Sequence, residues 1–172
     1  MLLNKINKMK EIILEKLTLN CGTGTEASKL ERALKMLQLL SNAKPVKTVA
    51  TRRIPTFDIS PGKNIGCMVT IRGANATELI KKLLAAINNK LSAKQINPGS
   101  FSFGIKEYIE IPGISFQRDI GILGLQACIT LKRAGFGIKK RKIKKGRIPV
   151  RHRISKEETI QWIQKNFNTE IK

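Results

Sequence analysis

An excess of positive charge limits what this chain can fold into more than any other feature of its sequence. Lys and Arg number 33 against 12 Asp and Glu, so the formal net charge is +21 over 172 residues. Such a charge destabilises a compact state through self-repulsion when nothing neutralises it. A polyanion removes this repulsion, and each phosphate that is contacted also releases a condensed counterion. The charge therefore favours nucleic acid as the partner, with an anionic membrane as the competing partner.

The charge is densest in the stretch KKRKIKKGRIPVRHR, residues 139–153, where nine of fifteen residues are Lys or Arg and none is acidic. Three interpretations of this stretch are open: a flexible tail, a localisation signal or a phosphate-binding surface. Because the stretch precedes a capped amphipathic helix, it lies inside the domain, and we predict a segment that RNA orders. The predicted contacts are Lys139, Lys140, Arg141, Lys142, Lys144, Lys145, Arg147, Arg151, His152 and Arg153.

The remaining composition is that of a folded protein. Hydrophobic residues make up 41%, and 172 residues suffice for a core without disulfides or metals. We expect one domain, 1–172, with an N-terminal extension at 1–10 and a basic RNA-binding segment at 137–153. No stretch reaches a membrane-spanning length, and the start, MLLNKINKMKEIILEK, is too charged for a signal peptide. We therefore expect a cytoplasmic protein with no membrane partner.

The three cysteines, Cys21, Cys67 and Cys128, are isolated from one another in the sequence, and the chain has a single His. Zinc sites need ligands paired at short spacing, which this arrangement does not provide. We predict buried thiols, no metal and no cofactor.

Hydrophobic periodicity predicts an α+β fold. Residues 15–21 and 65–71 alternate as half-buried strands do, and further strands are expected near 102–109 and 123–133. Apolar residues recur at helical spacing at 28–41, 77–91 and 155–167. Capping pairs are predicted at the helix starts: Ser28 with Glu31, Asn75 with Glu78, and Ser155 with Glu158. Helices packed on one face of a mainly antiparallel sheet would leave the other face and the loops free to bind RNA.

The strand faces that point away from the predicted core are polar. Lys16, Thr18 and Asn20 share one such face, and Met68, Thr70 and Arg72 share the other. A face of this kind is commonly just solvated. In so basic a chain it is also a candidate RNA surface, because hydroxyl, amide and cationic groups bind sugar and phosphate.

The stretch RRIPTFDISPGK, residues 52–63, is a long loop with two prolines that restrict its backbone. It has cations at both ends and Phe57 in its middle. The ring of Phe57 either stacks on a base or ribose or packs back onto the core, and the residues alone leave both open.

Catalytic groups are scarce. The sequence CGTGTE lacks the third glycine of the dinucleotide-binding fingerprint and the Gly-Lys-Ser/Thr of the Walker type, so a plain turn is favoured there. No nucleophile or acid–base pair can be recognised, and we predict that the chain is not an enzyme. The alternative is an RNA-modifying enzyme or its RNA-binding accessory subunit, which would need a cofactor pocket or an acid–base pair.

Four long motifs follow one another from about Lys10 to the C-terminus. They are KLTLNCGTGTE, NAKPVKTVATRRIPTFDISPGKNIGCMVTIRG, SFSFGIKEYIEIPGISFQRDIGILGLQACITLKRAGF and RIPVRHRISKEETIQW. In this order they resemble the large-subunit ribosomal protein five family, the 5S rRNA-binding protein of the central protuberance (protein eleven in eukaryotic cytoplasmic numbering). The RIPVRHRISKEE ending is similar to the archaeal and eukaryotic branch, and RRIPTF is similar to archaeal members.

The resemblance implies a structural role in the ribosome. The sheet surface and adjoining loops would bind 5S rRNA and large-subunit rRNA, beside other proteins of the central protuberance. The 52–63 loop would reach peptidyl-site tRNA, and the protein would contact a small-subunit head protein in an intersubunit bridge. The chain departs from the family at Ala43, where Gln is common, and at CGTG, where GVGE is common.

Asn20 and Thr70 match family positions that meet 5S rRNA, and both fall on the predicted polar face. The rRNA-binding residues implied outside the basic stretch are Asn20, Lys44, Lys47, Thr48, Thr70 and Arg72. The tRNA-contacting residues implied in the 52–63 loop are Arg52, Arg53, Thr56, Phe57, Ser60 and Lys63.

Overall fold

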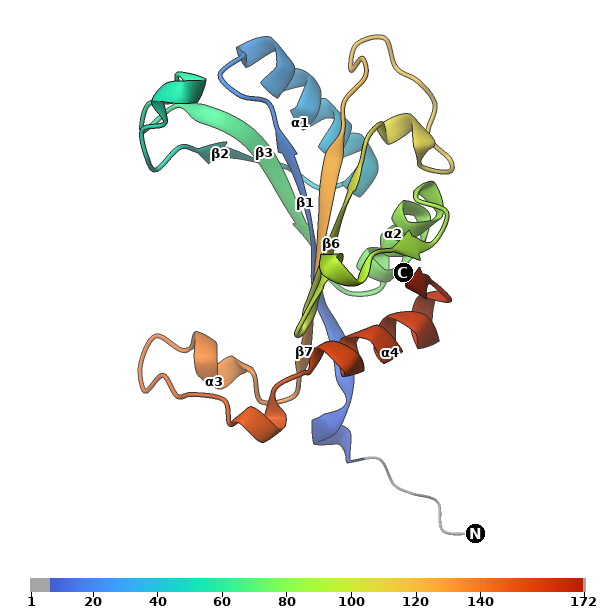
Figure 1. The fold of residues 1–172 in the computed structure, drawn as a ribbon. Coiled ribbons are helices and arrows are strands. Elements are labelled where there is room, and N and C mark those ends of the chain that lie inside the picture. The colour runs from blue at the N-terminus through green and yellow to red at the C-terminus, as the bar shows by residue number, and fades with distance from the viewer. Residues whose placement is uncertain (1–6, 172) are drawn as a thin grey trace.

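The computed structural model describes residues 7–171, so the predicted extension at 1–10 lies outside the described residues as far as residue 6. The centre of the fold is a six-stranded sheet in the order β2-β3-β1-β7-β6-β5, and every neighbouring pair of strands is antiparallel (Figure 1). The strands of this sheet are β1 (Ile12–Gly22), β2 (Val46–Val49), β3 (Asn64–Ile71), β5 (Ile96–Asn97), β6 (Ser100–Ile105) and β7 (Leu125–Arg133). A short parallel pair joins β4 (Lys90–Leu91) to β8 (Glu170–Ile171). The predicted α+β class is confirmed.

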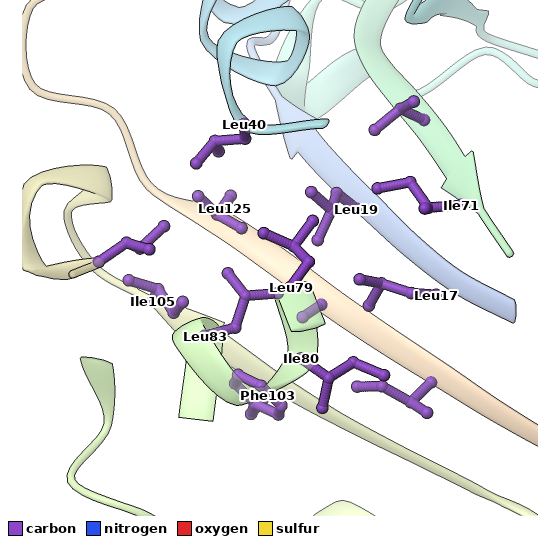
Figure 2. Packing of buried hydrophobic residues seen from close by; sticks show 14 of the residues in the cluster. Leu17, Leu19, Leu40, Ile71, Leu79, Ile80, Leu83, Phe103, Ile105 and Leu125 are labelled. Atoms are coloured by element: carbon purple, nitrogen blue, oxygen red, sulfur yellow. The ribbon is translucent and has the colours of Figure 1, made fainter. Parts of the chain in front are cut away.

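Helices cover one face of this sheet. They are α1 (Ala27–Ser41), α2 (Ala74–Ala86) and α4 (Lys156–Phe167), while the one-turn helix α3 (Gly137–Lys140) lies apart from them. In Figure 2 the side chains of Leu79, Ile80 and Leu83 on α2 pack over the strands. They are at most 8% exposed, and each contributes about 2 kcal/mol by its burial. The strands meet them with Leu17, Leu19, Ile71, Phe103, Ile105 and Leu125.

The central strand β1 follows the predicted alternation. Leu17, Leu19 and Cys21 are at most 3% exposed. The register with β7 shifts between Leu14 and Lys16, so Glu15 is an extra residue in a β-bulge.

Only one of the three predicted capping pairs is present. At α4 the Ser155 hydroxyl accepts from the Glu158 N–H (3.2 Å), and a Glu158 carboxylate oxygen accepts from the Ser155 N–H (2.9 Å). The predictions at Ser28 and Asn75 are wrong, because α1 begins at Ala27 and α2 at Ala74. Both residues therefore lie inside the first helical turn, where the backbone is no longer extended as a cap requires.

Glycine sets the start of α2. Gly73 precedes the helix with φ 75° and ψ −155°, a conformation that side chains disfavour. Over residues 7–171, no helix is both long and apolar enough to cross a membrane.

Candidate RNA-binding surface

The sheet face that the helices leave uncovered is lined mainly by small and polar side chains, together with the exposed apolar Val46 and Met68. Asn20 of β1 lies between Met68 and Gln126 on the neighbouring strands, and Thr18 lies between Thr70 and Cys128. The register extends these rows onto the remaining strands. We call the resulting surface the open face, and it consists of Thr18, Asn20, Val46, Thr48, Met68, Thr70, Ser102, Gly104, Gln126 and Cys128.

Two residues implied by the resemblance, Asn20 and Thr70, both lie on the open face. They sit on paired strands and are offset by two residues in the register, and Thr70 is exposed while Asn20 is half-buried. A depression of about 610 Å³ begins at Asn20, and it is lined by Asn20, Gly22, Gly104, Ile105, Lys106, Gly124, Leu125 and Gln126. Two amide side chains and one ammonium group therefore face a shared hollow, where they can bind base edges, 2′-hydroxyls and phosphate.

The backbone packs so closely at this hollow that position 124 must be glycine. A Cβ at this position would lie 2.7 Å from the carbonyl oxygen of Lys106 and 3.0 Å from that of Ile105, so no larger residue fits. Gln126 was missed by the sequence analysis. Its alternation with Cys128 and Thr130 along the predicted strand at 123–133 was the signal that would have placed it on the open face.

Other implied rRNA-binding residues are arranged less uniformly. Thr48 pairs with Gly66 and lies on the open face. Lys47 pairs with Cys67, whose side chain is in the core, so Lys47 is exposed on the helix side of edge strand β2. Lys44 and Arg72 are exposed in the connections beside β2 and β3. The structure thus brings Thr48, but not Lys47, to the surface that holds Asn20.

The cysteine prediction is correct for two thiols and wrong for the third. Cys21 and Cys67 are buried opposite each other on β1 and β3, whereas Cys128 is exposed. Cys128 lies between Thr18 and Ser102 on the open face, which no helix covers. A hydrogen bond between the two buried thiols lowers the pKa of Cys21 and raises the pKa of Cys67, which burial raises further. The Cys21 thiol donates its own proton to the Gly124 carbonyl oxygen (3.2 Å), so it is the acceptor in the bond with Cys67.

The 52–63 loop joins β2 to β3 and projects beyond the sheet (Figure 1). Ile54 and Ile59 form a β-bridge around a 3-10 turn at Pro55–Phe57. Phe57 is 69% exposed, so the alternative that its ring packs on the core is wrong. The implied contacts are exposed or half-buried on this loop: Arg52, Arg53, Thr56, Phe57, Ser60 and Lys63.

The basic segment, residues 137–153, projects from the opposite end of the sheet (Figure 1). Both projections lie on the side away from α2 and α4, so they flank the open face. All nine cations of residues 139–153 are exposed. Among residues 7–171, Lys140 is the only one of the nine with an ion-pair partner, the Glu15 carboxylate in the β1 bulge. The other eight are available to phosphate.

A buried arginine ties this segment to the fold. Arg133, 6% exposed at the end of β7, donates to the carbonyl oxygens of Lys10 (3.1 Å), His152 (3.4 Å) and Arg153 (3.1 Å). It also donates to a Glu158 carboxylate oxygen at 2.6 Å. This role was not predicted, although Arg133 continues the buried alternation of Ile129 and Leu131 along the strand.

His152 has a protein partner in this structure. Its Nε2 lies 2.7 Å from the Ala134 carbonyl oxygen, and its ring packs edge-on against Phe136 with centroids 5.8 Å apart. The imidazole therefore holds the end of the segment in place, so it is less free for RNA than the neighbouring arginines.

Glu158 combines two interactions at the same place. The hydrogen bond from the Ser155 N–H holds the pKa of the Glu158 carboxyl below its ordinary value, and the Arg133 guanidinium lowers it further against the opposing effect of burial. The capping carboxylate of α4 is thus also the counter-ion of the buried arginine.

A polar open face between two cationic projections defines a basic α+β protein that binds RNA. Family comparisons agree with this class. The family model described as "Ribosomal protein L5" matches residues 7–59, and a second model, described as the C-terminus of the same ribosomal protein family, matches residues 64–162. The chain belongs to the ribosomal protein L5 family, and it is of the archaeal type. It is therefore a structural ribosomal protein and not an enzyme.

Relatives from archaea match nearly the whole chain, and each is named large ribosomal subunit protein uL5. The protein of Nanoarchaeum equitans is 42% identical over 164 residues, which cover 95% of this chain and 97% of that protein. The protein of Sulfurisphaera tokodaii is 42% identical over 168 residues, covering 96% and 95%. The protein of Archaeoglobus fulgidus is 39% identical over 158 residues, covering 92% and 89%.

Proposed function

We propose that this chain is a structural constituent of the large ribosomal subunit that holds 5S rRNA on its open face. One observation carries the proposal: in a chain of net charge +21, the helices leave uncovered a sheet face rich in amides, hydroxyls and glycines, with the apolar Val46 and Met68 exposed on β2 and β3. Asn20 and Gln126 both donate and accept hydrogen bonds, as recognition of base edges and 2′-hydroxyls requires. The surrounding cations supply the phosphate contacts.

The basic segment contacts large-subunit rRNA in this proposal. Its eight cations without an ion-pair partner among residues 7–171 can neutralise phosphates from several directions. Other proteins of the central protuberance would lie beside the same RNA.

The 52–63 loop reaches the peptidyl-site tRNA. Support comes from the exposed Phe57, which offers a stacking surface, and from Arg52 and Arg53 on the same loop, which offer charge. A contact with a small-subunit head protein, forming an intersubunit bridge, completes the proposed set of partners.

The chain also folds as one unit in this proposal, although two family models match it in separate stretches. β1 and β2 come from the first stretch and β3, β6 and β7 from the second, and they alternate in one sheet. A fragment starting at residue 64 would lack the central strand. We expect it to show no cooperative thermal transition in circular dichroism, and a native-like transition would contradict the single unit.

Titration of 5S rRNA with the purified chain tests the main proposal, with tRNA as competitor and at two salt concentrations. We expect 5S binding to survive excess tRNA and the higher salt, with the affinity falling by roughly one logarithmic unit of slope per phosphate contacted. Asn20→Ala and Thr70→Ala should each weaken binding several-fold. Gln38→Ala, which removes an exposed side chain from helix α1, is the matched control and should leave binding unchanged. Equal loss in all three variants, or displacement by tRNA as easily as by 5S rRNA, would contradict the site.

A further inference from the structure

A pocket of about 570 Å³ opens between the basic segment and the end of the sheet. It combines apolar side chains with four cations. Its lining residues are Gly99, Phe136, Lys139, Lys145, Gly146, Arg147, Ile148, Arg153 and Ile154. We call it the basic pocket, and its volume lies within the range usual for sites that hold a small molecule or a single nucleotide.

One side of the basic pocket is apolar and fixed. Ile154 is 4% exposed, and Phe136 and Ile148 are half-buried. Gly99 adds no side chain, so this wall remains flat and open. The Gly99 N–H donates to the Thr159 hydroxyl (3.0 Å), and the Gly99 carbonyl oxygen accepts from the Leu131 N–H (2.9 Å). The sheet and α4 therefore fix the position of Gly99.

The other side carries charge. Lys139, Lys145, Arg147 and Arg153 are exposed, and none of them has an ion-pair partner among residues 7–171. A site for a lone phosphate needs cations but gains nothing from an aromatic and isoleucine wall. A flat apolar group joined to a phosphate satisfies both sides, and a nucleotide is such a group.

Hydrogen bonds hold both walls of the basic pocket in place. Arg133 holds the backbone at His152 and Arg153, next to Ile154. On the opposite side the Gly146 N–H donates to the Ile138 carbonyl oxygen (3.3 Å), and a Cβ at Gly146 would lie 2.7 Å from the Ile138 side chain. A larger residue at position 146 would therefore displace the Ile138 side chain where the turn that carries Lys145 and Arg147 meets α3.

We propose that the basic pocket receives one unstacked nucleotide of the RNA, with the base on Phe136, Ile148 and Ile154 and the flanking phosphates on the four cations. This inference rests on the proposed function, since it names what the basic segment recognises. It adds a contact with a base to a segment whose sequence indicates only contacts with phosphates.

Two short RNAs of equal charge test the inference: a penta-adenylate and the same chain with its central base removed. The missing base should lower the affinity of the wild-type protein about tenfold, because stacking is lost while the phosphates are unchanged. In Ile148→Trp, which fills the pocket, the two RNAs should bind equally. Val150→Trp is the matched control, because Val150 is 76% exposed in the same segment and does not line the pocket. That variant should retain the tenfold difference.

Equal binding of the two RNAs to the wild-type protein would overturn the inference, as would an equal effect of both tryptophan variants. A measurement on the wild-type protein guards against misfolding of the variants: penta-adenylate should shift the methyl resonances of Ile148 and Ile154, and ribose 5-phosphate should not. Free AMP should compete at least tenfold more weakly than penta-adenylate, since it lacks the flanking phosphates. The preference of the wild-type protein for 5S rRNA over tRNA is measured in parallel. If the wild-type protein shows no such preference, the proposed function is contradicted. The two short RNAs would still show whether the basic pocket binds a base.

Discussion

The two projections that flank the open face are built in different ways. The 52–63 loop is shaped by its own backbone: Ala50 and Lys63 are joined by an N–H···O bond of 2.9 Å, and Ile54 pairs with Ile59 farther out. The basic segment is instead held at its two ends by side chains from elsewhere, chiefly Arg133 and the Glu15 partner of Lys140. The loop therefore depends on local structure, whereas the segment depends on a few long-range contacts that single substitutions can remove.

Arg133→Ala should have the largest effect, because it removes four hydrogen bonds and leaves the Glu158 carboxylate without its guanidinium. The guanidinium is buried, although its carboxylate partner is 39% exposed, so the loss comes chiefly from the hydrogen bonds. At about 1 kcal/mol for each bond, we expect the free energy of unfolding in urea to fall by about 3 kcal/mol. Amide exchange should quicken at 150–153 but not in the 52–63 loop. Arg53→Ala, on the exposed loop, is the control and should change stability by less than about 0.5 kcal/mol. A loss below about 1 kcal/mol, or equal exchange at both projections, would remove the distinction between them.

Removal of equal charge from each projection sharpens the comparison in function. Replacing Lys144, Lys145 and Arg147 by Gln should lower the salt slope for binding deproteinised large-subunit rRNA by roughly two to three units, about one per phosphate lost. Replacing Arg52, Arg53 and Lys63 by Gln removes the same charge from the loop. If the two projections have separate partners, the salt slope of the loop variant should stay within about one unit of the wild-type slope. Equal slopes in the two variants would mean that net charge alone governs the binding.

The charge pattern and the alternation of side chains predicted much of this molecule. Alternation in β1 and β3 placed Asn20 and Thr70 on the uncovered face, because a period of two needs no knowledge of the partner strand. It made no prediction for Lys47, since the face on which an exposed edge residue lies is decided by pairing with Cys67. The capping pair at Ser155 was recognisable, but the start of α2 is set by the left-handed backbone of Gly73.

Long-range contacts were beyond prediction from the sequence. The bonds from Arg133 to residues 10, 152 and 153 join positions that are far apart in the chain, and nothing in the local pattern pairs them. The basic pocket likewise exists only because Gly99 and Ile154 meet the segment in space. The sequence showed that residues 139–153 are cationic, and the fold adds the apolar wall that could make them selective.

Acid should loosen the basic segment before the loop, with a smaller effect than the loss of Arg133. The pKa of Glu158 is below its ordinary 4.5 in the folded protein. Its contribution is therefore present above the unfolded pKa and is lost as the pH falls through the lowered value. Glu158→Gln keeps the cap but not the charge. It should cost about 1 kcal/mol or less at pH 7, because the side chain is 39% exposed and water screens the pair. The gap between wild type and variant in urea unfolding should narrow as the pH falls below 4.5, and a constant gap would contradict the linkage.

Phe57→Ala should have the smallest effect on stability and still separate the two projections. The ring is 69% exposed and the loop is held by backbone bonds, so the free energy of unfolding should change by less than about 0.5 kcal/mol. Affinity for 5S rRNA should also be unchanged, because the open face is untouched. In reconstituted ribosomes, peptidyl-site tRNA should dissociate several-fold faster, since a stacking surface is lost. Val49→Ala, which truncates another exposed apolar side chain near the base of the loop, is the control. If tRNA dissociates at the same rate from both variants, the ring has no role at the tRNA, and the loop would contribute through Arg52 and Arg53 alone.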